Sequence, residues 1–205
     1  MRSGIQKSRI EDITAASGLS KGAFYLHFKS KEALFRELVK ELEAHFEEAR
    51  FAREKAWGGL MRRGMPAPRN QGLFVVEVLA IEGGGDRQLL EVLWRWRDVI
   101  DVLLRGSQGT EFEQVMWTML DREVARVERQ CAPMLKAGLM RPDVPSYVIG
   151  SMIVGTYLLA ARRMSKLRDK PDFEPWVRSL QNVIVDGVSS GSLRVQRDAA
   201  MRRAR

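Results

Sequence analysis

Residues 10–31, IEDITAASGLSKGAFYLHFKSK, decide the fold of the N-terminal part of this chain. Two short segments, in which apolar residues recur at helical spacing, are separated here by Ser17-Gly18-Leu19-Ser20. Gly18 can adopt the positive φ that a tight turn needs, and Leu19 can fill the angle between the two helices. The stretch therefore predicts a helix-turn-helix, in which the second helix enters the major groove of DNA.

Small polar residues predict where the helices of this part begin. Ser8 opens a capping-box pattern, and Ser20 can cap the second helix, 21–28. Ser30 can cap a third helix, in which apolar residues keep helical spacing to about residue 53. Within the pair, Ile10, Ile13, Ala16, Phe24 and Phe28 are expected to face inward.

Basic residues concentrate in the same part of the chain. The formal net charge of the whole sequence is +8, and residues 1–31 carry six Lys or Arg against two acidic residues. Half of the net charge thus lies in about a seventh of the chain, as counterion release at phosphates would require. Net charge alone does not distinguish nucleic acid from an anionic membrane surface.

Residues 13–34, ITAASGLSKGAFYLHFKSKEAL, resemble the signature of the tetracycline-repressor (TetR) family of transcriptional regulators. The resemblance combines the turn glycine, a Lys-Gly pair, an aromatic-Tyr-x-His-Phe run and a capped Ser-Lys-Glu helix start. It covers about the first 40 residues. It implies a DNA-binding module of three helices, followed by a helical domain that senses a small molecule and dimerises through its last two helices.

The resemblance also implies which residues meet DNA. Those expected to contact phosphates are Ser8 or Arg9, Ser20, Lys21, Tyr25, His27 and Lys31. Those expected near base edges are Gly22, Ala23 and Leu26. Because Ala23 and Leu26 offer only apolar contacts, for example with a thymine methyl group, the sequence does not name the operator.

The chain departs from the family pattern at its N-terminus. Family members have a full helix before the one that contains Ile13, whereas only about seven residues precede Ser8 here. We interpret residues 1–4 as the last turn of that helix, with Gly4 as its C-terminal stop. The corresponding hypothesis is that the natural chain begins upstream of Met1.

The rest of the sequence also predicts helices. Residues 57–71 contain three glycines and two prolines and are interpreted as a linker or mobile loop. The Gly83-Gly84-Gly85 run is expected to end a helix, and Thr110, Asp143 and Asp172 to begin helices. The expected helices are 72–81, 86–104, 110–136, 143–167 and 172–191.

These patterns predict an all-α protein with an N-terminal helix-turn-helix module joined to a larger helical domain. Residues 1–50 are expected to form the DNA-binding domain, truncated at its N-terminus, and 51–192 the effector-binding and dimerisation domain. Residues 193–205 form a basic tail.

The last two expected helices are candidates for a homodimer interface. The helix after Asp143 is apolar almost all round and carries Gly150, Ser151 and Gly155, which permit close helix approach. The alternative is that both helices only close the core of the monomer. The expected interface residues are Gly150, Ile153, Val154, Tyr157, Trp176, Leu180 and Ile184.

Aromatic and methionine residues are candidates for an effector pocket. Such linings suit largely apolar, flat or cationic ligands, although for any one of these residues core packing is the favoured alternative. The candidates are Trp94, Trp96, Phe112, Met116, Trp117, Met119 and Tyr157.

Other motifs are missing from the sequence. No His/Cys cluster has metal-ligand spacing, and neither a Walker loop nor a nucleophile elbow occurs, so we expect no metal, cofactor or enzymatic activity. The single cysteine, Cys131, fits a reducing compartment, and a buried thiol is favoured over a redox sensor. The uncharged stretch 144–161 is interpreted as a buried helix rather than a membrane span, which favours the cytoplasm.

The favoured function is a sequence-specific DNA-binding transcriptional regulator, specifically a repressor that a small-molecule effector releases from operator DNA. An activator or a constitutive DNA binder is the nearest alternative. A ligand-binding or oligomeric interaction protein that has lost DNA binding is the alternative from another class.

Overall fold

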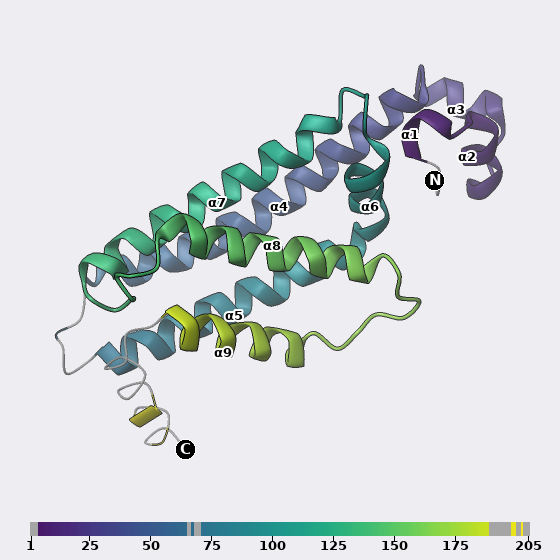
Figure 1. Cartoon of the computed structure of the whole chain (residues 1–205). Coiled ribbons are helices and arrows are strands. Elements are labelled where there is room, and N and C mark those ends of the chain that lie inside the picture. The colour runs from purple at the N-terminus through teal and green to yellow at the C-terminus, as the bar shows by residue number, and fades with distance from the viewer. Residues whose placement is uncertain (1–3, 65–66, 68–70, 189–197, 200–201, 203–205) are drawn as a thin grey trace.

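The computed structural model describes residues 4–64, 67, 71–188, 198–199 and 202, and its regular elements are α-helices (Figure 1). The all-α prediction is therefore confirmed for this part of the chain. The predicted basic tail lies outside the described residues except at Asp198, Ala199 and Arg202, as do Met1 and the side chain of Val188. The helices are α1 (Gly4–Lys7), α2 (Ile10–Ser17), α3 (Lys21–His27), α4 (Lys31–Arg62), α5 (Gln71–Arg95), α6 (Arg97–Gly106), α7 (Glu113–Lys136), α8 (Ser146–Met164) and α9 (Glu174–Val188).

Helices α1–α3 form a small module at one end of an elongated molecule (Figure 1). Helix α4 leaves this module and extends through the larger helical domain, where it packs on α5. Helix α8 packs on α7, and α9 packs on α5. The predicted domain boundary at residue 50 falls inside α4, so one continuous helix belongs to both parts.

The main core joins α1 to the larger domain. Phe35, Leu42, Leu90 and Met164 are fully buried at its centre, and Ile5 of α1 belongs to the same cluster. Burial of large apolar side chains supplies most of the stability of such a domain. The short α1 is therefore held by tertiary packing rather than by its own helical propensity.

Two glycines let α1 approach α6 at backbone distance. Gly4 has φ +77°, and a Cβ on it would lie 2.8 Å from the Cα of Gly106. A Cβ on Gly106 would lie 2.5 Å from the Cα of Gly4. The prediction that Gly4 ends a helix is wrong, because Gly4 begins α1 and its positive φ serves this close approach.

The predicted linker is wrong over residues 57–62, which form the end of α4. Trp57 and Leu60 are buried and pack with Phe74 and Leu139 in a second cluster. Their burial outweighs the low helical propensity of Gly58 and Gly59, each worth about 1 kcal/mol relative to alanine.

The glycine run 83–85 does not end a helix, because α5 continues through it to Arg95. A Cβ on Gly83 would lie 2.7 Å from the Gln181 amide nitrogen of α9, and one on Gly85 would lie 2.1 Å from Nε of Arg53. The glycines therefore give space to side chains from two neighbouring helices. The break occurs instead at Trp96, between α5 and α6.

The helix starts divide into confirmed and incorrect predictions. Ser20 and Ser30 each accept a backbone hydrogen bond three residues on, as expected of caps, and Asp172 accepts one from Glu174. Ser8 instead donates to the Ile5 carbonyl and does not cap α2.

Two further helices begin later than expected. Asp143 pairs with Arg141, and Pro145 precedes the first residue of α8. Thr110 accepts from the amide of Phe112, so α7 begins only at Glu113. No helix among the described residues is long and apolar enough to span a membrane.

Candidate nucleic-acid interface and internal cavities

The turn between α2 and α3 has the geometry that its sequence predicts. Gly18 adopts φ +68°, and its own amide and that of Leu19 bond back to carbonyls of α2. Leu19 itself does not fill the angle between the helices, because its side chain is 56% exposed. The inward prediction is likewise wrong for Ala16, which is exposed.

Helix α3 presents distinct sides. Phe24 is buried and its ring meets the edge of Tyr25 and the ring of Phe28. Leu26 is 83% exposed, and Tyr25 is half exposed. The outward side of α3 therefore offers an apolar side chain and a phenol to a partner, in keeping with a recognition helix that reads few polar base edges.

Lys21, at the start of α3, already has a partner in the structure. Its ammonium lies 2.5 Å from the Glu11 carboxylate of α2. The hydrogen bond between them raises the pKa of Lys21 and lowers that of Glu11. Both side chains are solvent-exposed, so the pair adds little stability and a phosphate can replace the carboxylate at low cost.

Lys31, a predicted phosphate contact, joins α4 to the end of α1 and to the residue after it. Its ammonium donates to the Gln6 carbonyl at 2.9 Å and to the Ser8 carbonyl at 3.1 Å. The other predicted DNA contacts divide by exposure: Ser8 and Ala23 are half-buried, whereas Arg9, Ser20, Lys21, Gly22, Tyr25, Leu26 and His27 are exposed.

Two adjoining cavities, each partly open to the surface, lie in the larger helical domain. Cavity A, about 120 Å³, has walls from α4, α5, α7 and α8 and is lined by Phe46, Leu89, Leu93, Met116 and Met119 among others. Cavity B, about 140 Å³, adds residues of α9 and is lined by Trp57, Phe74, Val75, Leu139 and Ile149 among others. The residues that border both cavities are Arg53, Arg126, Ile153 and Tyr157.

The predicted pocket residues divide between the cavities and the rest of the domain. Met116 and Met119 line cavity A, and Tyr157 lines both cavities. The other four candidates line neither of these two cavities. Trp94 lies under the Arg97 guanidinium, Trp96 packs beside His45, Phe112 meets the edge of Phe35, and Trp117 is exposed.

Arg53 forms the most deeply buried ion pair of the described residues. Its side chain is 7% exposed and lies 3.0 Å from Asp86 and 3.5 Å from Glu82. Burial disfavours its charge, but Glu82 and Asp86 outweigh this effect and raise the pKa of Arg53. Burial also raises the pKa of Asp86, against the opposing influence of Arg53.

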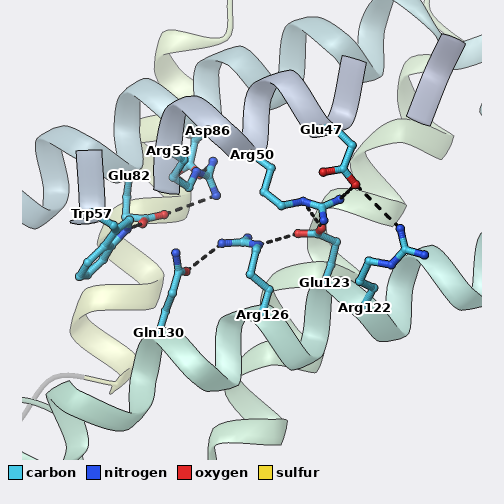
Figure 2. A network of polar contacts seen from close by, with 10 residues as sticks. All are labelled: Glu47, Arg50, Arg53, Trp57, Glu82, Asp86, Arg122, Glu123, Arg126 and Gln130. Carbon is cyan, nitrogen blue, oxygen red and sulfur yellow. Dashed lines mark hydrogen bonds and ion pairs between the residues drawn. The ribbon is translucent and has the colours of Figure 1, made fainter. Parts of the chain in front are cut away.

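A second network links α4 to α7 across cavity A (Figure 2). Glu123 contacts both Arg50, at 3.1 Å, and Arg126, at 2.8 Å. Arg50 also pairs with Glu47, which lies 3.8 Å from Arg122. Three guanidinium groups therefore share two carboxylates. The chain of contacts ends where Arg126 donates to the side-chain amide oxygen of Gln130.

Two further groups at the cavities are neutral at physiological pH. The Tyr157 hydroxyl is buried and makes no hydrogen bond of ordinary geometry, and its pKa is raised by burial and by nearby Asp86. Burial, with Glu82 and Glu128 nearby, raises the pKa of the Cys131 thiol to about 11. This thiol is thus poorly suited to redox sensing.

Comparison with known proteins finds similarity in the N-terminal segment. Residues 1–38 match the family model described as bacterial regulatory proteins, tetR family. Residues 1–38, under a fifth of the chain, are therefore similar to the N-terminal segment of tetR-family regulators. A similar relative, the uncharacterized HTH-type transcriptional regulator YerO of Bacillus subtilis (strain 168), is 58% identical over 33 residues. That match covers 16% of this chain and only 11% of YerO, and no solved structure matched significantly.

The expected interface residues on α8 differ in their exposure. Gly150 and Tyr157 are buried within the single chain, so their side of α8 faces its interior. Ile153 and Val154 are half-buried at the cavities. The remaining candidates, which lie on α9, are also half-buried. Trp176 and Leu180 pack against the main core, and Ile184 lines cavity B.

The outward faces of α8 and α9 carry other apolar residues. Tyr147, Met152 and Leu159 of α8 and Val183 of α9 are all exposed. Gly155 lies among those of α8, and a Cβ on it would meet nothing within 4 Å. This exposed apolar surface is what the sequence pattern could not separate from the inward face, because α8 is apolar almost all round.

Sequence reasoning missed the charged residues at the cavities. Arg53 continues the helical stripe of Phe46 and Ala49 and precedes Trp57 by four positions, a spacing that places it on the apolar face of α4. A charge within an apolar stripe was the available signal. Among the described residues, no cluster of three or more His, Cys, Asp or Glu side chains could hold a metal ion.

Proposed function

We propose that this protein is a ligand-responsive, DNA-binding transcriptional repressor that acts in the cytoplasm as a homodimer and has no enzymatic role. The observation that carries the proposal is the pairing of a helix-turn-helix similar to that of the tetR family, at one end of the molecule, with largely apolar cavities in the domain attached to it. A module that reads DNA needs no cavity, whereas a sensor does.

Helix α4 supplies a physical link between the two regions. It begins with Lys31 at the module, passes Arg50 and Arg53 at the cavities, and ends at Arg62, which is roughly 48 Å of helix. Arg36 of α4 pairs with Glu111 before α7, and α1 packs on α6. A ligand that displaces α4 at the cavities would therefore also reorient the module.

The exposed apolar faces of α8 and α9 support the homodimer. Two helices from each copy would form a four-helix interface and bury Tyr147, Met152, Leu159 and Val183. A two-fold dimer would present two α3 helices to half-sites about 34 Å apart, one turn of DNA.

Binding to the promoter DNA beside the gene of this protein tests the proposal. We expect tight binding whose affinity falls steeply with salt, and loss of that binding in Lys21→Ala. Glu11→Gln should bind more tightly at low salt, because it removes the carboxylate that competes with phosphate for Lys21. Lys166→Ala, an exposed lysine after α8, serves as the matched control.

The alternative, a ligand-binding protein that no longer binds DNA, has one observation in its favour. The ammonium groups of Lys21 and Lys31 both have intramolecular partners. Failure of the whole chain to bind any fragment of its own promoter at low salt would favour this alternative.

A further inference from the structure

Cavity B has hydrogen-bond donors on one side, the ion-paired Arg53, Glu82 and Asp86 on another, and a mainly apolar remainder. Arg126, Gln130 and Tyr157 border it on the side facing α7 and α8, and Trp57, Phe74 and Leu139 belong to the apolar remainder. Figure 2 shows Arg126 and Gln130 on α7, across from Arg53 and Glu82. A ligand that fits must therefore combine an apolar body with one polar end.

The groups on the donor side of cavity B are without full partners. Arg126 has a single carboxylate partner, Glu123, which it shares with Arg50. Gln130 accepts from Arg126 through its carbonyl, which leaves its NH₂ group to donate. The buried Tyr157 hydroxyl lies near Asp86 without a hydrogen bond of ordinary geometry and stays protonated, so it can turn to donate to a ligand.

The acceptors of the same cavity are already engaged. Glu82 and Asp86 both pair with Arg53, and Glu82 also accepts from the Trp57 indole. A ligand ammonium would have to displace Arg53 and would face Arg126 as a second cation. A ligand carboxylate would instead lie against Arg126, whose one carboxylate partner is shared with Arg50.

We propose that cavity B binds a monocarboxylic acid with a short to medium apolar chain, whose carboxylate is held by Arg126, Gln130 and Tyr157. The cavity has a volume of about 140 Å³ and a mainly apolar lining, which suits an alkyl chain. The role of this acid as effector rests on the proposed function, whereas its binding does not.

Calorimetric titration of the whole protein with octanoate, methyl octanoate and octylamine tests the ligand class. We expect octanoate to bind at least tenfold more tightly than the ester and the amine not to compete with it. Octanoate should also slow labelling of Cys131, which lines cavity B, at least threefold. Equal or tighter binding of the ester or the amine overturns the proposal, as does the absence of binding by every acid from hexanoate to dodecanoate.

Variants assign the binding to the named residues. Arg126→Met should reduce octanoate affinity at least tenfold and abolish the preference over the ester, and Arg126→Lys should restore part of it. Tyr157→Phe, which removes only the hydroxyl, should reduce affinity about threefold. Arg129→Met, an exposed arginine on the same helix, should bind octanoate unchanged. An undiminished preference for octanoate in folded Arg126→Met refutes the assignment.

DNA binding then separates this inference from the proposed function. Octanoate binding without release from promoter DNA means that the ligand class is right and the coupling is wrong. DNA binding without octanoate binding means that the ligand class is wrong, whereas the DNA-binding role stands.

Discussion

The helix-turn-helix module and the cavity region use charge in opposite ways. In the module, the Lys21–Glu11 pair lies in solvent, with both side chains more than half exposed. In the cavity region, the Arg53–Asp86 pair has side chains only 7% and 6% exposed. The distances are similar, at 2.5 and 3.0 Å, so the environment sets the difference in energy.

The difference separates a surface that must exchange partners from one that must stay fixed. An exposed ion pair is screened by water and salt, so Lys21 can move from Glu11 to a phosphate with little loss. A buried charge without its partner is strongly unfavourable, so Arg53 must keep its two carboxylates. The module is therefore arranged for reversible binding, and the cavity wall for a defined shape.

Removal of the Arg53 charge should have the largest effect. Arg53→Ala leaves the buried Asp86 and the half-buried Glu82 without their cation, and we expect the free energy of unfolding to fall by about 3–5 kcal/mol. Urea denaturation measures it. The matched control is Arg63→Ala, whose pair with Glu77 is exposed and should contribute little. Equal losses in the two variants would contradict the comparison. If Arg53→Ala does not fold, Asp86→Asn should give a smaller, measurable loss.

The second largest difference between the two regions is expected in the rate of thiol labelling. With a pKa of about 11, Cys131 is about 0.01% thiolate at pH 7, against about 3% for an ordinary thiol of pKa ~8.5. We expect labelling by a neutral disulfide reagent to be roughly 300-fold slower, with burial slowing it further. The rate should rise about tenfold per pH unit from 7 to 10, because thiolate accumulates as pH approaches the pKa.

A cysteine placed on the module provides the reference for that rate. Ala15→Cys in a Cys131→Ser background puts a thiol on an exposed position of α2. Fast labelling of this variant and slow labelling of native Cys131 are expected. Similar rates at both positions would show that cavity B opens readily to solvent.

Enlarging one glycine should have an intermediate effect. Gly106→Ala would place a methyl group 2.5 Å from the Cα of Gly4, so α1 must move away from α6. We expect a loss of about 1–3 kcal/mol in unfolding free energy, measured by urea denaturation. Gly84→Ala is the matched control, because its methyl group would meet nothing within 4 Å inside α5. Gly84→Ala should raise the free energy of unfolding by about 0.5–1 kcal/mol.

The smallest effect on stability is expected at the module surface. Glu11→Gln removes the charge from the exposed pair, and the urea midpoint should stay within experimental error of the native value. Circular dichroism during urea denaturation provides the measurement. A loss comparable to that of Gly106→Ala would mean that the surface pair holds α2 and α3 together.

The sequence predicted the module well because its geometry depends on residues close along the chain. Ser20 and Ser30 cap through amides three residues away, and Gly18 turns the chain within its own neighbours. The Gly83–Gly85 run was misread by the same local rules. Its meaning depends on Arg53 and Gln181, which come from other helices.

The sequence by itself determined the all-α class, the turn at Gly18 and the serine caps of α3 and α4. Only the tertiary structure decided which side of α8 is buried, that Arg53 pairs with Asp86 33 positions away, and that Gly4 packs on Gly106. The physical reason is the separation along the chain of the residues that interact. Caps and turns are satisfied within four residues, whereas the cost of a buried charge or a close backbone approach is fixed by whichever distant helix packs there.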